Sequence, residues 1–151
     1  MALLLSVNAC AGSGQSGERE YVYRSNIGNA TELDMQRVIP RYISRINFIM
    51  YRDNITLEGT YFETEWRERA PFDDEIALGA TQAQNMIVVS SRAPTGQVTS
   101  AHRAQIEIYN QLFIEEQGGW VRHISTAQAE EYFRDIARNL SQELESGVRN
   151  L

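Results

Sequence analysis

The feature that most constrains the fold is a long run of alternating side chains between Val98 and Ile114. Even-numbered positions in this run are mostly apolar, and odd-numbered positions are mostly polar. A period of two places the two sets on opposite faces of a β-strand. Such a strand buries its apolar face only as part of a covered sheet, so the chain must supply partner strands and a second layer. The apolar positions are Val98, Ala104, Ile106, Ile108, Leu112 and Ile114.

Several other segments predict the partner strands. Thr60 to Glu68 alternates, and the pattern predicts that Phe62, Thr64 and Trp66 face the core. The segment from Ala83 to Arg92 is apolar on both faces at its centre, which predicts a central strand covered on both sides. Shorter strands are expected at Tyr21–Tyr23, Phe48–Tyr51 and Trp120–Ile124, with a break at Gly59 and turns at Asn26–Asn29, Asp53–Asn54, Pro94–Gly96 and Gly118–Gly119.

Two helices are predicted at the ends of the folded part. Thr31 is a candidate N-cap with Asp34 three residues later, and a helical pattern that Pro40 should kink or restart follows to about residue 46. Near the C-terminus, Ser125 opens a capping box, and an apolar stripe runs to Gly147, a candidate C-cap. These elements predict an α+β fold: an antiparallel meander of about four to five strands, with an N-terminal helix and a long C-terminal helix packed on one face. A single domain is expected over residues 20–151.

The N-terminal residues carry a targeting pattern. Met1 to Val7 is apolar apart from Ser6, and Asn8, Ala9 and Cys10 follow it. The segment Val7-Asn8-Ala9-Cys10 resembles the lipobox of bacterial lipoprotein precursors. This resemblance implies a diacylglyceryl group on the Cys10 sulfur and cleavage of the bond between Ala9 and Cys10. Residues 10–19 would then be the lipidated cysteine and a flexible Gly/Ser tether.

A complete signal peptide has a positively charged start and a longer apolar run. Residues 1–9 are therefore expected to be a truncated signal peptide, with the true start codon upstream. The alternative that the sequence leaves open is a disordered tail with an exposed Cys10. No stretch approaches the roughly 20 apolar residues of a spanning helix, so attachment to a membrane would depend on the lipid.

The charge pattern disfavours a polyanionic partner. All 14 basic residues are arginine, but they are scattered singly among acidic residues and the net charge is −6. Arginine binds phosphate well. A nucleic-acid-binding chain would gather its arginines in a basic patch, which the sequence lacks. We therefore expect no nucleic-acid partner, and attribute the absence of lysine to coding bias.

Candidate chemistry in the sequence is sparse. His102 falls in the inward phase of the long strand, where a hydrogen-bonded core histidine is the simpler interpretation and a catalytic acid or base is the alternative. The acidic run Asp73-Asp74-Glu75 lacks the spacing of a calcium loop and is interpreted as a solvated loop pairing with Arg67 and Arg69. No metal site, cofactor or catalytic residue is predicted.

A contact surface is the remaining candidate. Tyr61 and Tyr109 occupy outward positions among polar residues, where aromatic side chains favour binding. The sequence thus predicts a non-enzymatic lipoprotein of the bacterial envelope, facing the periplasm from the outer membrane through Cys10, which binds an envelope protein or glycolipid. Two alternatives stay open: a small hydrolase or isomerase that uses His102, and a cytosolic domain with a disordered tail.

Overall fold

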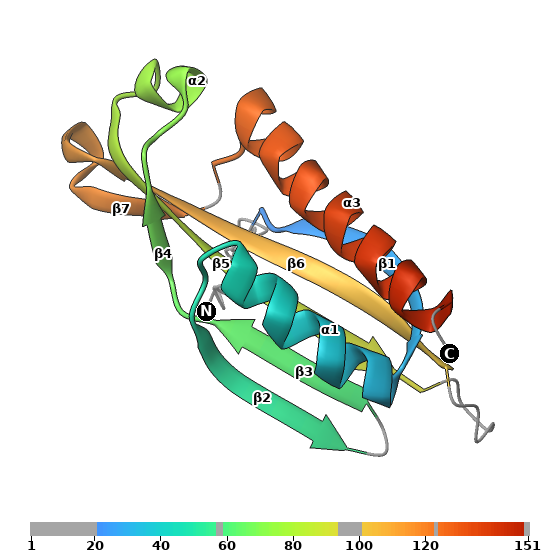
Figure 1. Cartoon of the computed structure of the whole chain (residues 1–151). Coiled ribbons are helices and arrows are strands. Elements are labelled where there is room, and N and C mark those ends of the chain that lie inside the picture. Colours follow the sequence, from blue (N-terminus) through green and yellow to red (C-terminus); the bar gives the residue numbers. More distant parts are fainter. Residues whose placement is uncertain (1–20, 57–58, 94–100, 123, 150–151) are drawn as a thin grey trace, which may run out of the picture.

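The computed structural model describes residues 21–56, 59–93, 101–122 and 124–149. These residues form a seven-stranded antiparallel sheet with two long helices, α1 and α3, packed on one face (Figure 1). The predicted α+β class is therefore confirmed, with more strands than expected. Within the described ranges, no helix combines the length and hydropathy needed to cross a membrane.

In the described part of the chain the strands form a meander, except that the first strand pairs with the sixth and not with the second. The order of the elements is β1 (Tyr23–Thr31), α1 (Glu32–Arg45), β2 (Met50–Thr56), β3 (Gly59–Thr64), β4 (Arg67–Arg69), α2 (Asp73–Ile76), β5 (Ala80–Arg92), β6 (Ala101–Ile114), the 3₁₀ turn η1 (Glu115–Gln117), β7 (Gly119–Arg122) and α3 (Ala127–Arg149). The sheet order is β1-β6-β5-β3-β2, with β4 also paired to β5 and β7 to β6. Every pairing is antiparallel.

One core lies between the helices and the sheet. The helical stripes predicted from the sequence supply its upper layer, and alternate residues of β3, β5 and β6 supply its floor. Tyr42 fixes the two helices together, since its hydroxyl donates a hydrogen bond to the Ile136 carbonyl at 2.9 Å. The central members of the core are Ile39, Tyr42, Ile43, Phe62, Ile87, Val89, Ile106, Ile108, Phe133, Ile136 and Leu140.

The helix starts follow capping chemistry. Thr31 accepts the Asp34 amide at 3.1 Å, as predicted, and Pro40 lies inside α1. At α3 the capping oxygen belongs to Thr126, which accepts the Ala129 amide at 3.3 Å, and not to Ser125. Gly147 lies within α3 and is not its C-cap. A Cβ on Gly147 would meet Val38 at 3.3 Å, so this glycine lets α1 and α3 approach closely.

Two predicted turns are wrong because the chain passes through them as strand. Asn26–Asn29 is a bulge in β1: Gly28 has φ +107° and donates its amide to Asn26 Oδ1 at 2.8 Å, and pairing with β6 continues to Thr31. Asp53–Asn54 lies inside β2. Turn-forming residues are tolerated there because a bulge suits glycine and β2 is an exposed edge strand.

A second bulge decides which way Trp66 points. Glu63 pairs with Val88 and Arg67 pairs with Asn85, so four steps along the β3–β4 segment match three steps along β5. The extra residue reverses the alternation between Phe62 and Trp66. Phe62 is buried as predicted, but Trp66 is 37% exposed on the other face, so its predicted place in the core is wrong.

Candidate functional site

The face of the sheet turned away from α1 and α3, here called the open face, is the candidate functional surface. Residues paired across antiparallel strands share a face. Ile87 and Ile108 are paired and enter the core, so their neighbours Met86 and Tyr109, also paired, point outward. The open face consists of Tyr61 and Glu63 of β3, Gln84, Met86, Val88, Ser90 and Arg92 of β5, Arg103, Gln105, Glu107, Tyr109 and Gln111 of β6, and Trp66 and Arg122 beside them.

In the part of the chain that the structure describes, helices cover β5 on one face only, whereas cover on both sides was predicted. Val88 points to the open face and is still only 6% exposed. Its register partners are Glu63 and Glu107, on the strands to either side. Within the described residues, neighbouring side chains and not a second layer therefore bury the outward apolar residue of this central strand.

The two predicted contact residues lie on this face, each half-buried and each bonded to an acidic neighbour. The Tyr61 hydroxyl donates to Glu63 Oε2 at 3.0 Å, and the Tyr109 hydroxyl donates to Glu107 Oε2 at 2.9 Å. Burial, reinforced by the hydrogen bond to Glu107, raises the pKa of Tyr109 to about 12. Burial and the bond to Glu63 also raise the pKa of Tyr61. Both phenols are therefore neutral donors at physiological pH.

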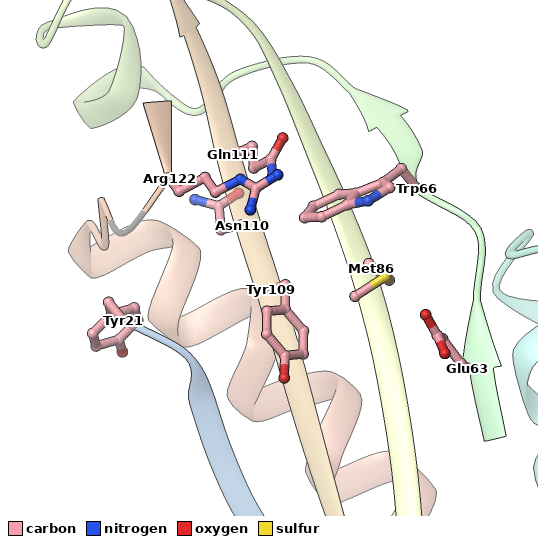
Figure 2. Close-up of a pocket in the computed structure, with 8 residues that line it drawn as sticks. All are labelled: Tyr21, Glu63, Trp66, Met86, Tyr109, Asn110, Gln111 and Arg122. Carbon is pink, nitrogen blue, oxygen red and sulfur yellow. The ribbon is translucent and has the colours of Figure 1, made fainter. Parts of the chain in front are cut away.

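A hollow of about 300 Å³ lies beside Tyr109. Figure 2 shows Trp66, Met86 and Tyr109 arranged across it, with Arg122 over Gln111 and Asn110 at its other side. Aromatic and thioether surface thus adjoins amides, a carboxylate and a guanidinium, the mixed chemistry of a recognition surface. The lining residues are Tyr21, Glu63, Trp66, Met86, Tyr109, Asn110, Gln111 and Arg122.

A buried polar network supports this hollow. Arg69 donates two hydrogen bonds to Glu75, from Nη1 to Oε2 at 2.7 Å and from Nη2 to Oε1 at 2.6 Å. Arg69 Nε donates to Asn85 at 2.7 Å, Asn85 donates to Asn110 at 2.7 Å, and Asn110 donates back to Glu75 at 3.2 Å. The Phe72 amide also donates to Glu75, at 2.9 Å. Since Asn110 lines the hollow, the network anchors the site to the α2 segment.

The acidic run is only partly as predicted. Glu75 is fully buried in an ion pair, so its place in a solvated loop is wrong, while its predicted pairing with Arg69 is confirmed. Arg67 instead donates to the Ile46 carbonyl at 2.6 Å and the Tyr132 hydroxyl at 2.7 Å. Among the described residues, no group of three acidic, histidine or cysteine side chains is placed to hold a metal ion.

His102 lies on the core side of the sheet and is 6% exposed. Its Nδ1 lies 3.3 Å from the Ser91 hydroxyl, which itself lies 2.9 Å from the Thr60 hydroxyl. No carboxylate bonds to His102 within the described part of the chain. The space between sheet and helices is filled by Ile106, Ile108, Phe133 and Ile136, each at most 6% exposed.

The lipobox residues, including Ala9 and Cys10, the tether over residues 10–19 and the Pro94–Gly96 turn lie outside the described residues. No sequence signal marks Trp66, Met86 or Arg122 as neighbours of Tyr109, because they meet only through the register of four strand segments. No protein-family model matches the chain, and no curated protein matches it significantly.

Proposed function

We propose that this chain is a lipid-anchored protein of the bacterial envelope whose open face is a non-catalytic binding surface. The observation that carries the binding role is the aromatic-rich hollow around Trp66, Met86 and Tyr109, on a sheet face that none of the described helices covers. Aromatic and methionine side chains are enriched where proteins recognise partners.

The proposed anchor is the lipidated Cys10, on the resemblance of Val7-Asn8-Ala9-Cys10 to the lipobox and on the Gly/Ser tether that follows. Two or more acyl chains on one residue hold a polar domain stably at a bilayer, at about 0.8 kcal/mol for each buried CH₂. The domain would face the periplasm from the outer membrane and bind an envelope protein or a glycolipid.

The packing around His102 weighs against the enzymatic alternative. A general acid or base needs a path to substrate and a partner that tunes its pKa. His102 is instead covered by core residues and bonded to a hydroxyl. Among the described residues, the lining of the hollow beside Tyr109 includes no histidine, cysteine or serine.

The anchor is tested by the mass of the N-terminal peptide from membrane-purified protein, compared with a Cys10→Ser variant. We expect the wild-type peptide to begin at Cys10 and carry fatty acyl mass, and the serine variant to stay uncleaved and leave the membrane fraction. Identical unmodified peptides would support a cytosolic domain with a free tail and end the anchor proposal.

The binding face is tested by placing a photo-cross-linking amino acid at Trp66 in the membrane-anchored protein. The matched control position is Arg138, which is exposed on α3 in the opposite layer. We expect a discrete adduct from position 66 and none from position 138. Equal adducts from both positions would contradict a binding role for the open face.

A further inference from the structure

A second hollow, of about 380 Å³, lies on the open face near the ends of β5 and β6 that adjoin residues 93 and 101. Arg92 and Arg103 line it, and they are direct register partners on neighbouring strands. Their side chains leave the same face, from Cβ atoms about 5 Å apart. Like charges directly opposite each other destabilise a sheet. The two arginines therefore cost stability unless an anion binds between them.

No described carboxylate neutralises the pair. Both arginines are exposed, and neither guanidinium group forms an ion pair or a side-chain hydrogen bond with another residue in the described ranges. Glu107 also lines the hollow, but its carboxylate already accepts bonds from Arg24 Nε at 3.0 Å and the Tyr109 hydroxyl at 2.9 Å. Within the described residues, two adjacent positive charges thus have no carboxylate bonded to them, on a chain whose net charge is −6.

Further donors surround the two guanidinium groups. Ser90 and Gln105 form the next outward pair on the same strands, and both line the hollow. The Gln105 amide donates to Glu107 at 3.2 Å, while the Ser90 hydroxyl lines the hollow with no hydrogen bond to any described side chain. The hollow therefore presents two guanidinium groups and one hydroxyl as hydrogen-bond donors for a compact anion.

We propose that Arg92 and Arg103 form a binding site for a single phosphate group. Guanidinium forks match phosphate oxygens in geometry, and two of them balance the −1.5 to −2 charge of a phosphate monoester near pH 7. Glu63 occupies another part of the open face, and Glu68 adjoins it as the register partner of Gln84, so an isolated phosphate fits and an extended polyanion does not. The site deepens the proposed function by assigning a ligand class to the open face, and it is independent of lipidation.

Inorganic phosphate is the first probe, added to the full-length Cys10→Ser chain at constant ionic strength set with sodium chloride. We expect saturable binding that raises the melting temperature by about 4 °C at about ten times the Kd. Amide shifts in NMR spectra should be confined to residues near 90–92 and 103–105. Arg92→Gln and Arg103→Gln should each weaken binding by about tenfold or more, because each removes a charge-assisted contact.

Arg138→Gln is the matched control, because Arg138 is exposed on the helical layer and paired with Asp135. It should bind phosphate like the wild type. Without phosphate, Arg103→Gln should melt no lower than the wild type, since it relieves the like-charge pair. Equal stabilisation of all variants, or an equal effect of chloride alone, would mean general screening and overturn the proposal.

Vesicle sedimentation of the same Cys10→Ser chain distinguishes a phosphate group on a lipid from one on a soluble molecule. Binding to phosphatidylglycerol vesicles that Arg103→Gln abolishes, with no binding to phosphatidylcholine, identifies a lipid headgroup. Phosphate binding without vesicle binding identifies a soluble phosphate ester. If phosphate does not bind while position 66 still forms a cross-link, only the phosphate-site proposal fails. If Cys10 is unmodified while phosphate still binds, only the proposed lipid anchor fails.

Discussion

The buried pair Arg69–Glu75 gives the sharpest test of how the candidate site is held in place. The Arg69 side chain is 8% exposed and the Glu75 side chain 0%, and two hydrogen bonds join them. Arg69→Met keeps much of the side-chain length and removes the charge. It leaves Glu75 as a buried carboxylate whose remaining donors are the Phe72 amide and Asn110.

The expected loss follows from that uncompensated charge. Removing one partner of a buried ion pair costs about 3–5 kcal/mol of unfolding free energy. For a domain of this size, each kcal/mol shifts the melting temperature by about 2–4 °C, so Arg69→Met should melt at least about 6–10 °C below the parent. The double variant Arg69→Met/Glu75→Leu removes the unpaired carboxylate and leaves only amide groups with fewer hydrogen bonds. It should therefore lose about 1–3 kcal/mol of unfolding free energy.

Urea denaturation of the Cys10→Ser chain, followed by circular dichroism, measures these values. Arg138→Met is the matched control, because it breaks an Arg–Asp pair whose two side chains are 59% and 49% exposed. An exposed pair contributes at most about 1 kcal/mol. The reasoning is refuted if Arg69→Met costs no more than Arg138→Met, or if the double variant is less stable than Arg69→Met.

Three further predictions concern the core and the open face. Gly59→Ala should destabilise the fold by about 1–3 kcal/mol in urea denaturation, because the added Cβ would lie 2.1 Å from the Ser91 carbonyl oxygen; an unchanged midpoint would contradict this contact. Phe133→Ala should cost about 3–5 kcal/mol by the same assay, since Phe133 is fully buried; a loss below 1 kcal/mol would show a poorly packed core. In ultraviolet titration, Tyr109 should ionise near pH 12, and Glu107→Gln should lower that pKa; a Tyr109 pKa near 10 in the parent would refute the assigned environment.

The sign of the Tyr109 effect on stability follows from the direction of its pKa shift. The folded-state pKa, about 12, lies above the ordinary value of 10. The stabilising contribution of the protonated phenol is therefore complete below about pH 10 and is lost as pH rises from 10 to 12. Alkaline denaturation of Tyr109→Phe should show a smaller loss across this window than the parent does.

Local patterns were sufficient for the secondary structure that depends on periodicity. The alternation around Ile106 and Ile108 predicted a strand with one buried face, and the stripe through Phe133 and Leu140 predicted the long helix beneath which that face is buried. The Thr31 cap was equally visible, because its bond to Asp34 spans only three residues. Each of these predictions needs information from one neighbourhood of the chain.

The bulges could not be predicted in the same way. Gly28 was interpreted as a turn and Trp66 as a core residue, because each bulge exists only where a second strand imposes its register. The two hollows could not be predicted from the sequence either, because strand pairing brings their residues together. Trp66 and Tyr109 are far apart in sequence, and Arg92 and Arg103 are separated by a loop. The scattered arginines in the sequence thus become a facing pair in the sheet.

Short-range spacing of residues is enough to predict the α+β class, the buried faces of the main elements and the lipobox-like pattern at Cys10, because each depends on neighbouring positions in the chain. Strand pairing and packing, in contrast, bring Trp66 beside Tyr109, bury Glu75 beneath the site and place Arg92 opposite Arg103. Those contacts depend on strand pairing between distant segments, and shifting the register by one residue would move each side chain to the opposite face.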